Sequence, residues 1–438
     1  MCRCTWTGSR RGNSRHILLL RKLYTVLLYL LAPLVLMRLA WRGLRAPDYW
    51  RRWPERFAFI EPALGKQVIW IHAVSVGEVQ AAVPVVHALL NRHPDYSLLV
   101  TTVTPTGSAR VTALFGGEVA HVYAPYDLPG AVARFFERVR PQLAIVMETE
   151  LWPNLFHQCR QRAIPLLLVN ARLSARSVAG YRRVRSLAAE TLAAVTEIAA
   201  QSEADAGRFE SIGARAATIT VTGNLKFEQR IPSSLLERAE VLRREWGVSR
   251  PVWIASSTHE GEDELLLDVY QQLRKQYSDC LLVLVPRHPE RFESVAALCR
   301  ARGYNTVLRT DHGACSTETQ VYVGNTMGDL PLLYAASDVA FVGGSLVASG
   351  GHNPLEPAAL GIPVISGPHV SNFIEICSLL VDAGAAVQVA DTGELLQIVS
   401  RWLGDANERH HVGQLGREVI EKNRGALQAV MAIIERYL

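Results

Sequence analysis

The chain has 438 residues and a mass of 48.4 kDa, with 49% hydrophobic and 20% charged residues. This balance is typical of a globular protein of two or three domains, and it excludes a disordered, collagen-like or multi-span membrane protein. The net charge of +5 is uneven, since residues 1–60 carry a net +10 and the remainder a net −5. Basic charge that flanks an apolar run indicates a membrane surface rather than a nucleic acid as partner.

The N-terminal segment contains an uncharged apolar run over residues 23–37. Fifteen residues are fewer than the roughly 20 that cross a bilayer as a helix. A cleaved signal peptide is disfavoured, because no small-residue cleavage site follows the run. A buried core helix remains an alternative. A membrane anchor is favoured, because Trp41, Trp50 and Trp53 lie among arginines just beyond the run. Whether the anchor crosses the bilayer or lies in its interface stays open.

Seven scattered cysteines form no Cys-x-x-Cys pair, which argues against a disulfide framework or zinc site and favours a reducing cytosol.

From residue 68 onward, apolar strands without polar alternation are each followed by a helix. Such a pattern predicts parallel sheets covered on both faces, here as two Rossmann-like domains that face each other across a cleft. We place the linker in the charged stretch Glu228–Arg250 and expect one helical run from Arg409 to Leu438. The expected strands are Val68–Ala73, Ser97–Thr102, Ala120–Tyr123, Leu143–Met147, Leu166–Val169, Glu197–Ala200 and Thr218–Val221, then Val252–Ala255, Leu281–Val285, Thr306–Leu308, Gln320–Val323, Val339–Val342, Pro363–Ser366 and Ala386–Val389.

The predicted organisation is an extension over residues 1–16, a membrane anchor over 17–45, a first domain over 46–232 and a second over 233–438. The last helix is free to pack back on the first domain. Ligands of open parallel sheets bind at the carboxyl ends of the strands, so the residues that follow each strand are candidate site residues.

Three acidic residues follow strands of the first domain. Glu78 falls in the first turn of the helix after Val68–Ala73, where a carboxylate can act as a general base. The Ser75-x-x-Glu78 spacing is also a capping box, so a purely structural role is an equal alternative. Glu148 and Glu150 follow another strand, either as a solvated turn or as part of a site. Lys226, after a further strand, is placed to meet a carboxylate or a phosphate, or lies on the surface.

Glycine-rich and basic loops follow the strands of the second domain. Arg287 can pair with a phosphate, and Gly343-Gly344-Ser345 can bring backbone N–H groups to an anion. Asn353-Pro354 opens a helix, and Glu356 in its first turn can accept hydrogen bonds from ribose hydroxyls. No Gly-x-Gly-x-x-Gly, phosphate loop, Gly-x-Ser-x-Gly, Asp-x-Asp or His-Glu-x-x-His motif occurs. These absences disfavour a dehydrogenase, an ATPase, an α/β-hydrolase and a metal site.

Ten segments occur in the order seen in one known family. They are HAVSVGE, TPTGS, PYDLP, METELWPN, NARLSARS, TGNLKFE, STHEGE, PRHPERF, GGS and GGHNPLEP. Over residues 20–438 the chain thereby resembles the 3-deoxy-D-manno-octulosonic-acid (Kdo) transferases of lipopolysaccharide biosynthesis. The resemblance implies a GT-B glycosyltransferase that moves Kdo from CMP-Kdo to lipid IVA by an inverting, metal-independent mechanism. It also implies a position on the cytoplasmic side of the inner membrane.

The resemblance also assigns roles to individual residues. It implies that Glu78 is the catalytic base, and that the other matching positions contact CMP. It implies no further cofactor, no nucleic acid and no obligate protein partner. A UDP-sugar transferase of the same fold and a non-catalytic nucleotide-binding module are the alternatives. The implied CMP contacts are Pro286, Arg287, Met327, Gly328, Asp329, Asn353, Pro354, Leu355 and Glu356.

Overall fold

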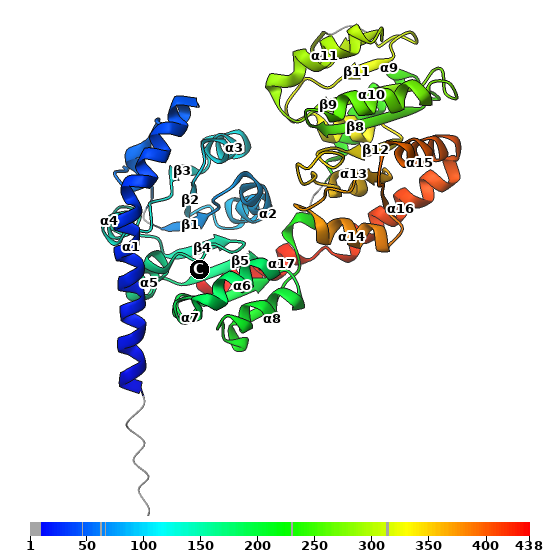
Figure 1. The fold of residues 1–438 in the computed structure, drawn as a ribbon. Helices are drawn as coiled ribbons and strands as arrows, with labels where there is room; N and C mark the ends of the chain where they lie inside the picture. Colours follow the sequence, from blue (N-terminus) through cyan, green and yellow to red (C-terminus); the bar gives the residue numbers. More distant parts are fainter. Residues whose placement is uncertain (1–9, 46, 62–63, 66, 229–230, 312–314) are drawn as a thin grey trace, which may run out of the picture. The chain divides into compact units, whose positions relative to one another are not determined.

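The computed structural model describes residues 10–45, 47–61, 64–65, 67–228, 231–311 and 315–438. These residues form two compact units, each built on one parallel sheet (Figure 1). The first unit holds Met1–Glu228 together with Arg424–Leu438, and the second holds Gln229–Asn423. Within the predicted extension 1–16, residues 1–9 lie outside the described residues, and the backbone is helical from Arg10 onward.

The first unit is built on a sheet with the strand order β3-β2-β1-β4-β5-β6-β7. All pairings are parallel, as the unbroken apolar strands predict. Side chains of β1 alternate between two cores, with Ile69 and Ile71 in one and Val68 and Trp70 in the other. The strands are β1 (Val68–His72), β2 (Ser97–Thr102), β3 (Ala120–Tyr123), β4 (Leu143–Met147), β5 (Leu166–Ala171), β6 (Glu197–Ala200) and β7 (Ile219–Val221).

Helices cover both faces of this sheet. Val79 and Val85 of α2 belong to the core on one face, and Phe135 and Phe136 of α4 belong to the core on the other. The α-helices are α1 (Arg10–Arg45), α2 (Val76–Arg92), α3 (Pro105–Phe115), α4 (Pro129–Val139), α5 (Pro153–Gln161), α6 (Ala175–Arg183), α7 (Arg185–Leu192), α8 (Glu203–Ser211) and α17 (Ala426–Ile434). The short 3-10 helices are η1 (Pro47–Tyr49), η2 (Trp53–Phe57), η3 (Ala216–Thr218), η4 (Leu225–Phe227) and η7 (Glu435–Tyr437).

The last helix, α17, belongs to the first unit. Ala426, Val430 and Met431 lie in the same core as α2. The Tyr96 hydroxyl donates a hydrogen bond to the carbonyl of Leu438 at 2.9 Å. The chain therefore returns to the first unit after completing the second.

Helix α1 is long and apolar. An 18-residue window within its segment Leu20–Leu44 has a mean hydropathy of 1.9, and by length and composition the segment is a candidate membrane span. The predicted anchor is helical throughout, and its large apolar side chains from Leu20 onward are mostly exposed.

The second unit is built on a parallel sheet with the order β10-β11-β9-β8-β12-β13-β14. Its two cores again lie on opposite faces, with Trp253 and Leu282 in one and Ile254 and Val283 in the other. The strands are β8 (Val252–Thr258), β9 (Leu281–Pro286), β10 (Thr306–Leu308), β11 (Val321–Val323), β12 (Val339–Val342), β13 (Val364–Ser366) and β14 (Ala386–Gln388). The helices are α9 (Ser233–Trp246), α10 (Glu262–Leu273), α11 (Phe292–Ala301), α12 (Leu330–Ala335), α13 (Leu355–Leu360), α14 (Ile374–Asp382), α15 (Thr392–Gly404), α16 (Ala406–Lys422), η5 (Pro289–Arg291) and η6 (Arg309–Asp311).

Two details differ from the sequence-based expectations. Most of the charged stretch expected to be a linker is helix α9, which buries Leu242 and Trp246 in the second unit. The helical run expected from Arg409 to Leu438 is two helices, α16 and α17. The break falls at Gly425, whose φ of 106° lies in the left-handed region that favours glycine.

Candidate active site

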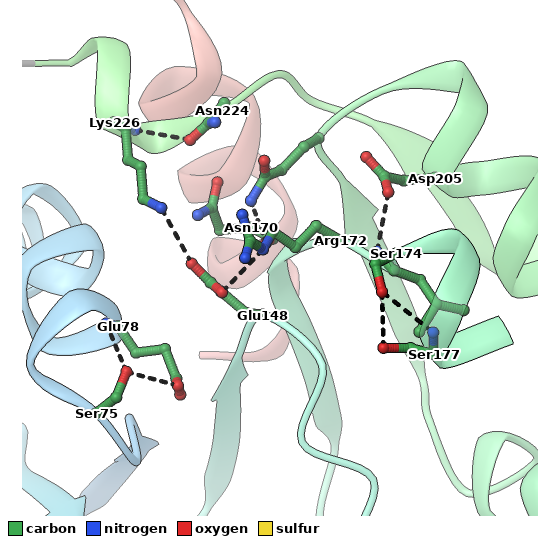
Figure 2. Close-up of polar contacts among 12 residues, drawn as sticks. Ser75, Glu78, Glu148, Asn170, Arg172, Ser174, Ser177, Asp205, Asn224 and Lys226 are labelled. Atoms are coloured by element: carbon green, nitrogen blue, oxygen red, sulfur yellow. Dashed lines mark hydrogen bonds and ion pairs between the residues drawn. The ribbon is translucent and has the colours of Figure 1, made fainter. Parts of the chain in front are cut away.

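The carboxyl edge of the first sheet gathers charged side chains from several loops. Glu78 lies in the first turn of α2, directly after β1. Glu148 follows β4, Arg172 follows β5 and Lys226 lies in η4 after β7. Figure 2 shows the side chains of Glu78, Glu148, Arg172 and Lys226 from these separate loops in one region.

Glu78 is held by the start of its own helix. Its Oε2 accepts a hydrogen bond from the Val74 N–H at 2.9 Å, and its Oε1 accepts one from the Ser75 hydroxyl at 2.9 Å. The Ser75 Oγ in turn accepts from the Glu78 N–H at 3.3 Å. The capping alternative is therefore realised, but it does not expose the acid to water, because Glu78 is only 7% exposed.

The environment of Glu78 suits a proton acceptor. Burial raises the pKa of its carboxyl to about 8, and the negative charge of Glu150 and, to a lesser degree, that of Glu148 act in the same direction. The hydrogen bonds from Val74 and Ser75 oppose the shift without cancelling it. A general base works best when its pKa lies near the working pH.

Glu148 lies between two cations. Its Oε2 is 3.2 Å from Nε of Arg172, and its Oε1 is 3.5 Å from Nζ of Lys226 (Figure 2). Its backbone has a φ of 54°, which a non-glycine residue seldom adopts without a functional or packing reason. The expectation that Lys226 meets a carboxylate is therefore confirmed, and the solvated-turn alternative for Glu148 is wrong.

Glu150 is held by an aromatic neighbour. The Trp152 Nε1–H donates a hydrogen bond to Oε2 of Glu150 at 2.7 Å. Burial raises the pKa of Glu150, with a further contribution from the charge of Glu148. The Trp152 ring lies edge-on to the ring of His72, with 4.8 Å between the ring centroids.

Asn170 joins β5 to the loop that carries Lys226. It has a φ of 55° and lies where the pairing of β5 with β6 shifts register. Its Oδ1 accepts a hydrogen bond from the Leu225 N–H at 2.9 Å, while Asn224 Oδ1 accepts one from the Lys226 N–H at 2.9 Å. These bonds fix the backbone at Lys226.

Sequence reasoning did not assign roles to Arg172, Asn170, Trp152 or His72. Arg172 and Asn170 lie in the NARLSARS segment directly after a predicted strand, which was the available signal. His72 is fully buried and its Nδ1 lies 2.8 Å from Oγ1 of Thr101. Burial lowers the pKa of His72 to about 3, so its ring is neutral.

In the second unit, Pro286 and Arg287 lie at the end of β9. Pro286 is the last residue of the strand, and the Arg287 N–H donates to the carbonyl of Thr258 at 3.0 Å. This bond ties the carboxyl ends of β8 and β9 together. Both residues therefore stand at the sheet edge where a nucleotide was expected.

The Met327-Gly328-Asp329 turn follows β11. Met327 is 64% exposed, and Gly328 has a φ of 95°, which accounts for glycine at this position. Asp329 accepts hydrogen bonds from Thr326 at 2.9 Å and from Nε of Arg309 at 3.3 Å. The carboxylate is thus held by Thr326 of its own turn and by Arg309 of η6.

The Asn353-Pro354-Leu355-Glu356 segment forms the entrance to α13. Oδ1 of Asn353 accepts from the Leu355 N–H at 3.1 Å, and its Nδ2 donates to Oε1 of Glu356 at 3.3 Å. Leu355 and Pro354 are buried, while Asn353 and Glu356 are partly exposed. The polar side chains of the predicted set therefore stand at the surface of this edge.

One expectation about this edge is wrong. The N–H groups of the glycine-rich loop after β12 were expected to receive an external anion. Instead, the N–H groups of Gly344, Ser345 and Leu346 donate to the carboxylate of Glu262 at 2.6, 3.0 and 2.9 Å. Glu262 also accepts from the His259 N–H at 2.9 Å and is fully buried. An internal carboxylate occupies the place predicted for the ligand.

Three histidines, His259, His288 and His352, form a cluster beside that loop. Nε2 of His259 is 2.8 Å from Nε2 of His352, and the ring of His288 lies edge-on to that of His259 at 5.4 Å. Burial lowers the pKa of His352 to about 4, and the positive charge of Arg287 adds to this effect. The contact between His259 and His352 joins the STHEGE and GGHNPLEP segments.

Among the described residues, no group of three or more His, Cys, Asp or Glu side chains is placed to hold a metal ion.

Two family models match the chain. Residues 51–229 match the model described as 3-deoxy-D-manno-octulosonic-acid transferase (kdotransferase), and residues 258–419 match that of glycosyl transferases group 1. In solved structures, a UDP-GlcNAc 2-epimerase from Neisseria meningitidis bound to UDP-GlcNAc has a TM-score of 0.57 at 15% identity. The match covers 84% of this chain and 100% of that chain, and it shows a shared fold alone.

Two curated relatives match nearly the whole chain. A 3-deoxy-D-manno-octulosonic acid transferase from Haemophilus influenzae is 44% identical over 421 residues, which cover 95% of this chain and 99% of the relative. One from Bordetella pertussis is 36% identical over 431 residues, with the same coverage of 95% and 99%. The chain has two Rossmann-like units of the GT-B class, and it belongs to the 3-deoxy-D-manno-octulosonic-acid transferase family of glycosyltransferases.

Proposed function

We propose that the protein moves Kdo from CMP-Kdo to lipid IVA with inversion at the anomeric carbon, and that Glu78 is the general base. Membership of the Kdo transferase family supports the donor sugar. The observation that carries the mechanism is the buried Glu78 carboxylate at the carboxyl edge of the first sheet, with a pKa raised to about 8.

The proposed step moves one proton and exchanges one bond. A primary hydroxyl of the acceptor loses its proton to the Glu78 carboxylate as its oxygen attacks the anomeric carbon of Kdo. The bond between that carbon and the phosphate oxygen of CMP breaks, and CMP leaves with the electron pair. The charge that builds on the departing phosphate requires cationic or N–H partners.

The second unit offers such partners at its carboxyl edge. Arg287 follows the last residue of β9, and its positive charge lowers the pKa of His352. We assign CMP recognition to Arg287 with Pro286, to the 327–329 turn and to the 353–356 segment. Because these groups meet the phosphate charge, we propose that transfer needs no metal, and chelation by EDTA should leave the rate unchanged.

The acceptor is proposed to reach the site from a membrane surface. The apolar helix α1 belongs to the unit that carries Glu78, and its large side chains are exposed. We propose that this helix holds the enzyme on the cytoplasmic face of the inner membrane, where a lipid-borne hydroxyl is available.

The test is a transfer assay joined to nucleotide protection. Purified full-length protein in detergent micelles, given CMP-Kdo and lipid IVA, should release CMP. CMP should raise the melting temperature and UDP should not, because a ligand stabilises the state that binds it. Protection by UDP alone would indicate a UDP-sugar transferase, and CMP protection without turnover would indicate a non-catalytic module. Either result would contradict the proposal.

A further inference from the structure

Helix α1 is tied to the first unit near the start of its apolar segment. The Tyr24 hydroxyl donates a hydrogen bond to Oδ2 of Asp127 at 3.0 Å. Thr25 Oγ1 donates to Oδ1 of Asn154 at 3.2 Å, and Nη1 of Arg21 lies 3.4 Å from the same oxygen. Asp127 and Asn154 are themselves joined, because the Asn154 N–H donates to Asp127 at 3.0 Å. The start of the apolar segment is therefore fixed to a polar, buried junction of the folded unit.

The chain that follows α1 returns to the same junction. The Tyr126 N–H donates to the carbonyl of Arg56 at 2.8 Å, and the Tyr123 N–H donates to Oε2 of Glu55 at 2.9 Å. Tyr126 is the direct neighbour of Asp127, which holds Tyr24. The two ends of the segment Tyr24–Arg56 are thus bonded to consecutive residues of one loop.

The return path is folded against the helix and is polar. The Trp50 Nε1–H donates to the carbonyl of Ala40 at 3.1 Å, so the chain doubles back beside the last turns of α1. Between Tyr24 and Ala40 the helix extends roughly 24 Å, at about 1.5 Å per residue. The returning residues 45–56 include six charged side chains. Such a segment does not cross a hydrocarbon layer, where unpaired polar backbone and charge are costly.

One side of α1 is covered and the others are open. The half-buried or buried positions recur every three or four residues, as expected for one helical face. They are Arg21, Tyr24, Thr25, Leu28, Ala32, Leu36, Leu39 and Gly43. Leu23 and Leu30, on other faces, are 63% and 70% exposed.

We propose that α1 does not cross the bilayer but lies along its surface, with its open apolar faces in the boundary between headgroups and acyl chains of an anionic membrane. The exposed cations Lys22, Arg38 and Arg42 then contact anionic headgroups, and Trp41, Trp50 and Trp53 lie at the interface. This inference rests on the geometry of α1 and not on the transfer reaction. It deepens the proposed membrane location by fixing both ends of the segment Tyr24–Arg56 on one side.

The first test is the topology of the full-length protein. An epitope tag at the N-terminus and another at the C-terminus are probed with protease in sealed inside-out and right-side-out inner-membrane vesicles. A surface helix places both tags on the same side, so both are cleaved in one vesicle type and protected in the other. A crossing helix places them on opposite sides, and that result would overturn the proposal whether or not the protein transfers Kdo.

The second test is the depth of the helix in vesicles that contain 30% phosphatidylglycerol. Nitroxide labels at Leu23, Leu30, Met37 and Leu44 should all report similar, shallow depths. A profile that is deepest at Leu30 and shallow at both ends would instead indicate a span.

The third test measures how much the cations of α1 contribute to membrane binding. The triple variant K22E/R38E/R42E should lose about tenfold or more in binding to the anionic vesicles, since each reversal replaces an attraction to the anionic surface with a repulsion. The matched control is the triple reversal R244E/K275E/R300E, at exposed positions of the second unit. Equal losses in the two triple variants would contradict a specific role for the α1 cations.

Discussion

Ser75 and Glu78 hydrogen-bond each other in both directions at the start of α2. The Ser75 hydroxyl donates to the Glu78 carboxylate at 2.9 Å, and the Glu78 N–H donates to the Ser75 oxygen at 3.3 Å. The same carboxylate is buried beside Glu150 and has a raised pKa. Capping and base catalysis are therefore compatible here, because the cap fixes the orientation of an acid whose proton affinity is set by burial.

Replacement of Glu78 by Gln should remove transfer and keep the fold. Glutamine keeps one oxygen that can accept from the Val74 N–H, and its amide nitrogen can donate to the Ser75 hydroxyl oxygen, but it cannot take a proton. Loss of a general base lowers rates by about 10²–10⁴-fold. The rate of CMP release, with circular dichroism as the check on folding, measures this. Glu118→Gln, at an exposed position of the same unit, is the control and should keep full activity.

The pH profile of kcat/KM should carry the signature of a buried acid. Because the pKa of Glu78 is about 8, the active, deprotonated form is a minority at neutral pH, and the rate should rise with pH and reach half of its plateau near pH 8. Glu150→Gln removes a negative neighbour, so the pKa of Glu78 should fall and the rising limb should move to lower pH. An unchanged limb in that variant would show that Glu150 does not act on the base.

Stability should depend on pH through the same residue. A carboxyl whose pKa is raised by folding stabilises the protein less as pH rises from the unfolded value, near 4.5, toward 8. Glu78→Gln has no such loss. The melting temperature of the variant, relative to the natural protein, should therefore be higher at pH 8 than at pH 5. A difference that does not vary with pH would contradict the shifted pKa.

Glu262→Ala should destabilise the second unit severely. It leaves the N–H groups of His259, Gly344, Ser345 and Leu346 without their acceptor. Each buried, unpaired donor costs about 1–3 kcal/mol. Thermal unfolding measures the loss, and protection by CMP should disappear with it. Glu264→Ala, an exposed acid in the same helical turn, is the matched control and should change stability little.

Gly343→Ala should be destabilising for a steric reason. A Cβ at this position would lie 2.7 Å from the carbonyl oxygen of Ser256 and 2.9 Å from that of Ser257. Backbone atoms of a central strand cannot yield easily, and overpacking of this kind costs about 1–3 kcal/mol. Gly303→Ala, where no atom lies within 4 Å, lacks this clash and carries only the cost of its φ of 82°. Equal unfolding midpoints for Gly343→Ala and the natural protein would contradict the packing.

The strands could be predicted from the sequence because parallel strands buried on both faces are unbroken apolar runs, as in Val68–His72 and Leu281–Pro286. Because the ends of the strands could be placed, residues that follow their carboxyl ends, such as Glu78 and Lys226, could be singled out as candidate site residues. The acceptor of the Gly344 N–H could not, because Glu262 lies 82 positions earlier and only the folded sheet brings them together. Helix α9 was mistaken for a linker because its few buried residues are outnumbered by charged ones.

The pairing of Glu148 with Arg172 and Lys226 also needed the structure. The sequence placed each residue after a strand, but not the distances between strand ends. The left-handed backbone at Glu148 has no signal in the sequence, whereas asparagine at position 170 is a residue that adopts this region more often than most non-glycine residues.

The most direct test of the central claim is mass spectrometry of the glycolipid after incubation of the full-length protein with CMP-Kdo and lipid IVA. We predict that the mass of lipid IVA increases by one or more Kdo residues, and that Glu78→Gln leaves it unchanged. Lipid IVA that keeps its mass with the natural protein, or gains Kdo equally well with the Glu78→Gln variant, would contradict the account.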